Sequence, residues 1–349
     1  MRNPLLIVPA FIAIIIVAIS LNSCAGSPNP TRGDYLYPEI SISKDDRNIV
    51  FAYRKNTPAS ICIAKSDGTD VKQLTYPQNE DHIKPKYSPD GSRILFISFP
   101  LDSDKPSGRI NLMNVDGTNI RQLPSVEGSI SEAIFSPDGE KIYFINSAVY
   151  KHYSPFVPRA SHGFDIYSMT VDGKDIKRLT NKNEYSMSDL CVFSDGKTLL
   201  FHQEIDKVHA KDEEGHTIPI YTFHFLSLDS NEIIYLRPSG DFVSTFEYAL
   251  SPDDKTVVFQ AQVGSGRDMS FELFSMDMKT RETRQLTKLG GAAKRPIFFN
   301  NSEKLLFLHD ANWEAWSPGR VDKPEENLMQ VNIDGSDLKK IVLRGITRE

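Results

Sequence analysis

The chain has 349 residues, of which 40% are hydrophobic, 10% aromatic and 25% charged, and its formal net charge is −6 at pH 7. This composition is typical of a folded globular protein and excludes collagen, coiled coils and polytopic membrane proteins. Acidic and basic residues are interspersed, without a basic block. The charge therefore gives no reason to expect nucleic acid as a partner.

A short apolar segment lies at the beginning of the chain. It runs from Leu5 to Ile19, is interrupted only by Pro9 and follows the positively charged Arg2. A bilayer span needs roughly 20 apolar residues, and this run is shorter. A charged start before a short apolar run is typical of a secretory signal peptide, which is not part of the fold.

The end of this segment reads Leu21-Asn22-Ser23-Cys24. It resembles the bacterial lipobox, although Asn22 departs from the small or aliphatic residue usual at that position. The resemblance implies a lipoprotein signal peptide over residues 1–23 and an acylated Cys24, which would hold the protein at a membrane surface. Residues 24–36 are rich in Gly, Ser, Pro and Asn and are expected to form a flexible tether. The expected location is the bacterial cell envelope, at the outer membrane or the periplasmic, extracytoplasmic face.

A turn motif then recurs about every 50 residues. The full motif, an aromatic residue followed by Ser-Pro-Asp-Gly, occurs at residues 87–91 and 135–139. Four degenerate copies begin at Ser43, Phe193, Ser251 and Asn300. Pro, Asp and Gly in this order favour a tight turn, and a burst of β-branched and aromatic residues follows each copy. Each motif therefore predicts a β-hairpin.

A second hairpin follows in every repeat. In residues 110–123, an alternating strand leads through Asp116-Gly117 into another strand, and Asp-Gly between such strands is a strong hairpin signal. Equivalent segments occupy residues 61–74, 166–179 and 328–341, while 223–236 and 273–286 keep the strands without the Gly. Four strands in each of six repeats predict an all-β fold, a six-bladed β-propeller of four-stranded antiparallel blades over residues 37–345. Because all copies share one frame, we expect the last blade to pack on the first without exchanging a strand.

These repeats resemble the TolB-like propeller repeat, which also occurs in prolyl oligopeptidases and oligogalacturonate lyases. The resemblance rests on the Ser-Pro-Asp-Gly turn, the strand that follows it, and the Asp-Gly turn before Arg-Gln-Leu or Lys-Arg-Leu-Thr. It implies the propeller fold, but the α/β domain that precedes the TolB propeller has no counterpart after Cys24. Since one fold carries many functions, the resemblance leaves the function open.

Three long insertions are expected as loops on one face of the propeller, at residues 146–164, 202–222 and 309–327. The opposite face has only tight turns. Long loops on a rigid scaffold often carry binding residues, and aromatic rings beside polar donors suit glycans, peptides or proteins. The candidate ligand-binding residues on this long-loop face are Tyr153, Arg159, His162, His202, His309, Trp313 and Trp316.

Charged residues recur near the end of the innermost strand of each repeat. They are Glu39, Lys84, Glu132, Asp189, Glu247 and Arg295. If these side chains turn inward, they form a ring of mixed charge near one mouth of the central channel. We expect this ring to be paired between blades.

The function predicted from these features is that of a lipid-anchored envelope module that binds a protein, peptide or glycan through the long-loop face. No Gly-x-Ser-x-Gly elbow, His-Glu-x-x-His helix or phosphate-binding loop occurs, and no cofactor is expected. Two alternatives stay open. The first is a carbohydrate-active enzyme resembling oligogalacturonate lyase, with a divalent metal held by histidines of that face. The second is a purely structural envelope protein with a stable protein partner.

Overall fold

The computed structural model describes residues 35–55, 58–152, 159–211, 215, 217–240, 242–265, 268–313 and 326–345. The predicted signal peptide, the lipid attachment site Cys24 and nearly all of the tether lie outside these residues. Within the described part of the chain, no helix has the length and apolar character needed to cross a membrane.

The described residues form 24 strands, β1 to β24. The first two sheets comprise β1 (Tyr35–Ile42), β2 (Asn48–Arg54), β3 (Ser60–Lys65), β4 (Lys72–Gln73), β5 (Glu80–Tyr87), β6 (Arg93–Pro100), β7 (Arg109–Asn114) and β8 (Arg121–Gln122). The next two comprise β9 (Ser129–Phe135), β10 (Lys141–His152), β11 (Arg159–Thr170), β12 (Lys177–Arg178), β13 (Ser188–Val192), β14 (Thr198–Lys211), β15 (Thr217–Ser227) and β16 (Ile233–Leu236). The last eight strands are β17 (Thr245–Leu250), β18 (Thr256–Val263), β19 (Ser270–Asp277), β20 (Thr283–Gln285), β21 (Ala292–Phe298), β22 (Lys304–Asp310), β23 (Glu326–Asn332) and β24 (Lys339–Ile341).

The strands pair as antiparallel meanders in chain order. Four sheets have the predicted four strands, but β17 to β24 form one sheet of eight strands, so the expectation of six separate sheets is not met. The physical reason is local. Phe271 of β19 pairs in parallel with Ala292 of β21, and the Phe271 N–H donates to the Gly291 carbonyl at 2.9 Å. This contact continues the hydrogen-bonded ladder from one meander into the next.

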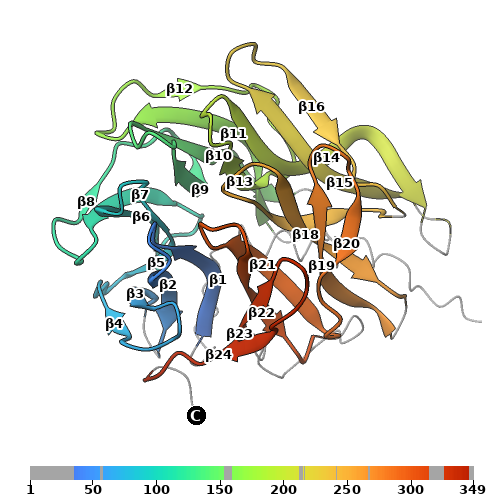
Figure 1. Cartoon of the computed structure of the whole chain (residues 1–349). Coiled ribbons are helices and arrows are strands. Elements are labelled where there is room, and N and C mark those ends of the chain that lie inside the picture. The colour runs from blue at the N-terminus through green and yellow to red at the C-terminus, as the bar shows by residue number, and fades with distance from the viewer. Residues whose placement is uncertain are drawn as a thin grey trace, which may run out of the picture.

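The first strands of the meanders surround a central axis. Contacts connect β1 with β5, β5 with β9, β9 with β13, β13 with β17 and β17 with β21, and β21 contacts β1. Figure 1 shows the meanders radiating from this ring. The fold is therefore an all-β propeller with four-stranded antiparallel sheets, as the repeats predicted.

The ring closes by side-chain packing. Ile40 and Phe51 of the first sheet share one apolar cluster with Leu306, Leu328 and other residues of β21 to β24. In the described part of the chain, β1 to β4 pair only with one another, which confirms that no strand is exchanged there. Hydrogen bonds support the seam, since the backbone N–H of Asn300 donates to Asp46 at 2.7 Å.

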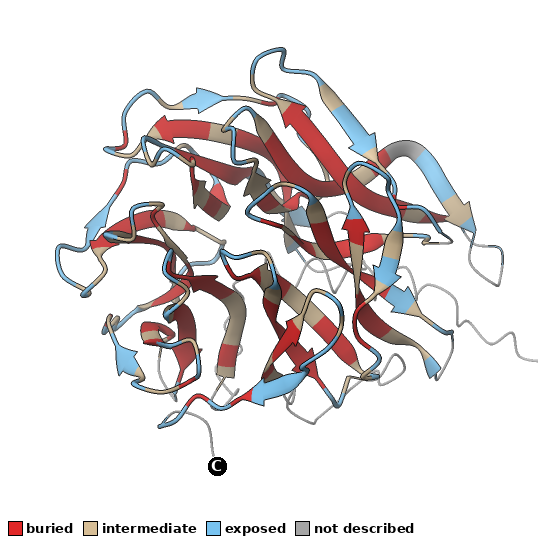
Figure 2. Ribbon diagram, in the orientation of Figure 1, coloured by how far each residue is buried: buried red, intermediate tan, exposed pale blue. Residues whose placement is uncertain are grey.

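Apolar surface is buried between neighbouring sheets. The inner strands are covered on both faces, and the run Ile94–Ile97 of β6 is completely buried. The outermost strands β4, β8 and β12 are exposed instead. Figure 2 shows this gradient from buried inner strands to exposed outer ones. Removal of this apolar surface from water is the main driving force that holds the sheets together.

The recurring turn motif forms a side-chain hydrogen-bond network. The Ser88 hydroxyl donates to Asp90 at 2.5 Å and accepts the N–H of Arg93 at 2.9 Å. Gly91 then takes a positive φ of 73°, which glycine adopts without steric cost. In the degenerate copies, Asp46 and Asp254 occupy the glycine position with φ of 61° and 60°. The Asp46 carboxylate accepts the N–H of Asn300, and the Asp254 carboxylate accepts the N–H of Ser194. Both hydrogen bonds join the turn to the neighbouring meander of the ring.

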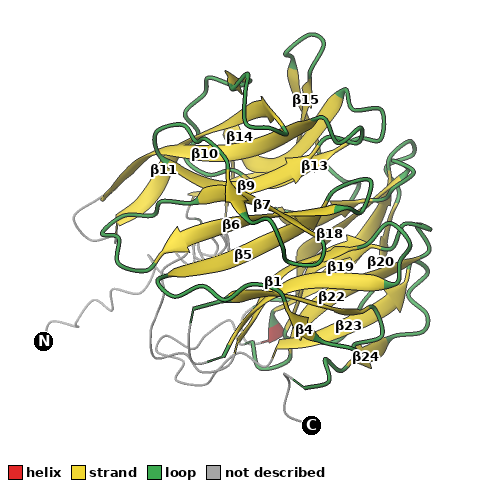
Figure 3. Ribbon diagram, turned by 90° about the vertical axis from the view of Figure 1, so that its left-hand side faces the viewer, coloured by secondary structure: helices red, strands yellow, loops and turns green. Residues whose placement is uncertain are grey.

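Two of the three expected long loops are mostly strand. β10 continues to His152 and β11 begins at Arg159, so the segment 146–164 is largely a β-hairpin. β14 and β15 extend in the same way over most of 202–222. Figure 3 shows the β10–β11 hairpin projecting at the left of the molecule. The prediction of loops failed because the two strands of each hairpin pair with each other beyond the rest of the sheet. Their backbone groups are satisfied by this pairing, so the sequence needs no alternating apolar pattern there.

Candidate functional site

A cavity of about 460 Å³ lies on the axis of the propeller. The first strands of the meanders line it, together with Pro137, Ser194 and Asp254 from the recurring turns. The cavity therefore lies on the side of the tight turns, opposite the long hairpins. Its walls are mainly apolar and include Ile40, Ala133, Leu190, Ala249, Leu250, Ile297 and Phe298.

The six charged residues singled out in the sequence all line this cavity, which confirms the predicted ring. Irregularities in the inner strands place them there. The register of β5, β13, β17 and β21 shifts around Lys84, Asp189, Glu247 and Arg295, respectively. These four residues have positive φ values of 42° to 57°, uncommon for residues other than glycine. The bulges remove these side chains from the alternation of the strands.

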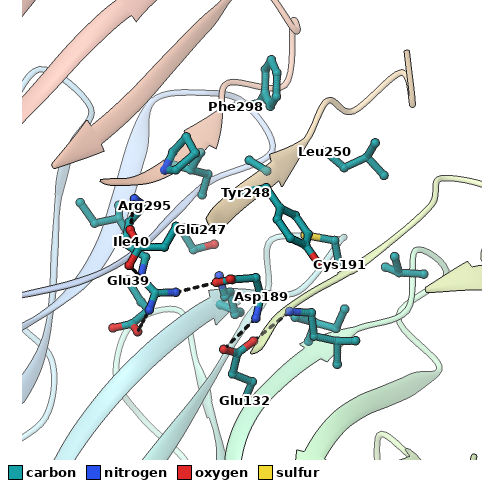
Figure 4. Close-up of a pocket in the computed structure, with 18 of the residues that line it drawn as sticks. Glu39, Ile40, Glu132, Asp189, Cys191, Glu247, Tyr248, Leu250, Arg295 and Phe298 are labelled. Atoms are coloured by element: carbon teal, nitrogen blue, oxygen red, sulfur yellow. Dashed lines mark hydrogen bonds and ion pairs between the residues drawn. The ribbon is translucent and has the colours of Figure 1, made fainter. Parts of the chain in front are cut away.

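Ion pairs connect the ring across the sheets (Figure 4). Arg295 lies 2.8 Å from Asp189, 3.3 Å from Glu247 and 3.9 Å from Glu39. Lys84 lies 3.4 Å from Glu39 and 3.8 Å from Glu132. All six side chains are 12% exposed or less, so water screens these pairs only weakly. The expected pairing between sheets is thus confirmed.

Backbone groups hold two of the carboxylates in place. Glu132 accepts the N–H groups of Asp189 at 3.0 Å and Leu190 at 2.9 Å. Glu247 accepts the N–H of Arg295 at 3.1 Å. Each acid therefore bridges the inner strand of its own meander to the inner strand of the next. By contrast, the ion pairs of the Glu39 carboxylate with Lys84 and Arg295 are longer, at 3.4 Å and 3.9 Å.

The electrostatics of the ring are unbalanced. Four carboxylates face two cations, which gives a formal charge of −2. Burial raises the pKa of Glu247, and the neighbouring Asp189 adds to this, while Arg295 offsets only part of the effect. Burial also acts on Glu39, but Lys84 and Arg295 hold its pKa below the ordinary value. Despite its own burial, Arg295 has a strongly raised pKa because Glu247, Asp189 and Glu39 surround it.

Tyr248 adds a polar group to the wall of the cavity. Its side chain is 5% exposed, and its hydroxyl has no hydrogen-bond partner among the described residues. Figure 4 shows its ring beside Cys191, on the same side of the cavity as Asp189. A buried hydroxyl without a partner has a desolvation cost that a ligand or an ordered water would remove. The cavity thus combines a charged floor, apolar walls and one available hydroxyl.

The three candidate histidines are buried strand residues. His202 on β14 lies with Nε2 2.6 Å from the Thr245 carbonyl and stacks on Tyr221. His309 on β22 lies 2.8 Å from the carbonyl of Gly290, and His162 on β11 packs against the ring of Tyr185. In the described segments, no three His, Cys, Asp or Glu side chains gather as a metal ion would require.

The structure describes two of the other four candidates of the long-loop face. Arg159 is exposed at the start of β11, and Trp313 packs edge-on against Phe271, with ring centroids 5.0 Å apart. Tyr153 and Trp316 lie outside the described residues, as does the connection from 314 to 325. Neither Arg159 nor Trp313 lines the axial cavity, whereas the six charged ring residues come together there.

Two buried histidines should make the stability depend on pH. Burial lowers the pKa of His202 and of His224 to about 4 each, below the value of about 6.5 in an unfolded chain. Their contribution is complete above pH 6.5 and is lost as the pH falls towards 4, because only the unfolded chain binds the protons. His224→Phe should reduce the slope of unfolding free energy by about 1.4 kcal/mol per pH unit in this window. Urea unfolding between pH 7 and 4 measures it.

The matched control for this experiment is His209→Phe, because the side chain of His209 on β14 is 45% exposed. This variant should keep the slope of the unmodified protein. Equal slopes for His224→Phe and the unmodified protein would mean that His224 takes up its proton in the folded state.

The closed ring of sheets and the axial cavity define the class: an all-β propeller. No protein-family model matches the chain. In fold, it is similar to TolB from Acinetobacter baumannii, with a TM-score of 0.59 and 19% identity over 96% of this chain and 70% of that one. It is also similar to an oligogalacturonate lyase in complex with manganese, with a TM-score of 0.56 and 13% identity over 88% of this chain and 78% of that one.

Two curated proteins match parts of the sequence. The chain is 26% identical over 129 residues to the uncharacterized peptidase YuxL of Bacillus subtilis, covering 37% of this chain and 17% of that protein. It is 20% identical over 254 residues to dipeptidyl-peptidase 5 of Porphyromonas endodontalis, covering 58% of this chain and 36% of that protein. The chain thus spans well under half the length of both. At these identities, the structural likeness concerns the fold alone.

Proposed function

We propose that this protein is a binding module of the bacterial cell envelope, anchored by a lipid on Cys24, that captures a segment of a protein or peptide. The observation that carries the proposal is the axial cavity with its charged floor and apolar walls. The similarity of the fold to TolB supports an interaction module of this kind. In this proposal, the eight-stranded sheet counts as two blades, which gives a six-bladed TolB-like propeller.

The shape and chemistry of the cavity favour a segment over a folded domain. A volume of about 460 Å³ accommodates a few side chains, and the turns that carry Pro137, Ser194 and Asp254 border it. Small-molecule and peptide sites commonly combine apolar walls with a few polar groups that fix the orientation of the ligand. The sequence favoured the long-loop face as the binding surface, and we now place the ligand on the opposite, turn face.

The proposal predicts that a bulky residue at the border of the cavity abolishes binding. Ser194 is exposed there, and its hydroxyl donates to Asp254 at 2.5 Å. Ser194→Trp should cover part of the opening, whereas Ser194→Ala loses the same hydrogen bond without adding bulk. In a native pull-down from detergent-solubilised envelopes, a stoichiometric partner should remain on Ser194→Ala and be lost from Ser194→Trp.

Two other outcomes would contradict this placement. Retention of the partner on Ser194→Trp, with loss on a Tyr153→Ala, Trp313→Ala and Trp316→Ala triple variant, would move the site to the long-loop face. About one equivalent of a divalent metal in the same sample, without a partner, would favour the second candidate function. That candidate is a carbohydrate-active enzyme, supported by the likeness of the fold to the lyase in complex with manganese.

A further inference from the structure

We propose that the axial cavity is specific for a positively charged side chain, a lysine or arginine presented by an extended and partly apolar peptide segment. This inference deepens the proposed function and rests on it, because it names the chemistry of the ligand at the same site. The charges, contacts and walls of the cavity carry the argument.

The first step is the excess of negative charge at the floor. Around Arg295, three carboxylates share one guanidinium: Glu39, Asp189 and Glu247. The excess persists when the whole lining is counted, because Asp254 adds one negative charge and Lys86 one positive charge to the ring. Five carboxylates minus three cations leave −2. In a site of low exposure, such an imbalance attracts a cation strongly.

The second step is the availability of particular carboxylate oxygens. Asp189 accepts hydrogen bonds from Arg295 at 2.8 Å and from the Ser188 hydroxyl at 3.0 Å, and Glu132 has two backbone donors. The ion pairs of Glu39 are longer, at 3.4 Å to Lys84 and 3.9 Å to Arg295. The Glu247 carboxylate accepts the Arg295 N–H at 3.1 Å and lies 3.3 Å from the Arg295 guanidinium, which it shares with Asp189 and Glu39. Glu39 and Glu247 flank Arg295 in Figure 4, so a second cation can bind beside them.

The third step distinguishes a side chain from a bare metal ion. In the part of the chain that the structure describes, no three potential ligands are arranged to hold a metal. An ammonium or guanidinium group needs only hydrogen-bond acceptors, which the carboxylates and the buried Tyr248 hydroxyl supply. The apolar walls formed by Ile40, Leu250 and Ile297 suit the methylene stem and the apolar neighbours of such a side chain.

Three blocked tripeptides test the proposal: acetyl-Leu-Lys-Leu-amide and the same peptide with Gln or Glu in the middle. Their ends carry no charge, so the central side chain decides the binding. By isothermal titration calorimetry at pH 7 with the full chain, the Lys peptide should bind at least about tenfold more tightly than the Gln peptide. The Glu peptide should not bind. Added salt should weaken the binding of the Lys peptide and leave the binding of the Gln peptide unchanged.

Variants of the floor locate the effect. Glu39→Gln should lower the affinity for the Lys peptide about tenfold and leave the affinity for the Gln peptide unchanged. Lys86→Gln removes a positive charge that repels the ligand and should raise the affinity for the Lys peptide. Since Lys86 is only half-buried and in no described ion pair, this variant also serves where Glu39→Gln folds poorly. Equal binding of the Lys and Gln peptides, a preference for Glu, or no measurable binding of the Lys peptide would overturn the inference.

Failure of this inference is distinguishable from failure of the proposed function. If a partner binds the protein and Ser194→Trp releases it, but the peptides show no preference for positive charge, the cavity is the binding site and the specificity is wrong. If Ser194→Trp retains the partner, the site itself is wrong.

Discussion

Arg295→Met should lower the free energy of unfolding by about 3 to 5 kcal/mol at pH 7, because removal of one partner leaves buried charge uncompensated. Arg295 is the cation shared by Glu39, Asp189 and Glu247, whose side chains are 6% to 11% exposed. Methionine keeps much of the volume and removes the charge. Urea unfolding, followed by circular dichroism, measures the difference.

The pH dependence of this variant gives a second readout. Burial already raises the pKa of Glu247, and loss of Arg295 removes the main group that offsets this, so the cost of its buried charge is present above that pKa and is relieved as the pH falls through it. The difference in unfolding free energy between Arg295→Met and the unmodified protein should therefore become smaller as the pH falls from 7 to 4. Arg47, 82% exposed in its side chain, is the control, and Arg47→Met should change stability by less than about 0.5 kcal/mol. A stable Arg295→Met would mean that water solvates the ring.

The second large effect is expected from Asp165→Ala, with a loss of about 3 to 5 kcal/mol. Asp165 on β11 is 1% exposed. Its carboxylate accepts the Thr180 hydroxyl at 2.6 Å and the N–H groups of Lys182 at 2.8 Å and Asn183 at 3.2 Å, and it pairs with Arg178. Alanine leaves all of these donors without their acceptor. Thermal or urea unfolding checks the prediction.

Two further variants test the cause. Asp165→Asn keeps one acceptor oxygen and should lose less stability than Asp165→Ala. Asp172 lies in the exposed turn after β11, where it bonds to Thr170 and pairs with Lys174, and Asp172→Ala should have a much smaller effect because water replaces those contacts. Equal losses for Asp165→Ala and Asp172→Ala would show that burial is not the reason.

The fold was predictable because its signals are local. The Ser88 and Asp90 network is encoded in adjacent residues, and the same is true of the Asp116-Gly117 hairpin turn. The charged ring was also predictable, because each member lies at nearly the same distance from its turn. The fusion of two meanders was not, since it depends on one contact between Phe271 and Ala292 that no pattern in either strand reveals.

The surroundings of the candidate residues could not be predicted from the sequence, because burial is a property of the assembled ring. His202 and Trp313 were interpreted as ligand-binding residues from their polar and aromatic character, yet His202 bonds to the Thr245 backbone and Trp313 packs on Phe271. The ring was interpreted as structural pairing, which is correct but incomplete. Its excess of carboxylates becomes meaningful only once the cavity encloses them.

The bulges at Lys84, Asp189, Glu247 and Arg295 have a consequence for how such a protein can change. A residue that has left the alternation of its strand belongs to neither face of the sheet, so its side chain takes no part in the apolar packing between sheets. The residues that line the axial cavity can therefore change while the apolar packing between the sheets is kept. The constraint on such changes is collective: a new set of side chains is acceptable when its buried charges balance one another or balance a ligand. Related proteins should therefore differ at these positions by paired substitutions that keep the buried charge balanced. Each such set of residues would define a different binding preference on the same propeller fold.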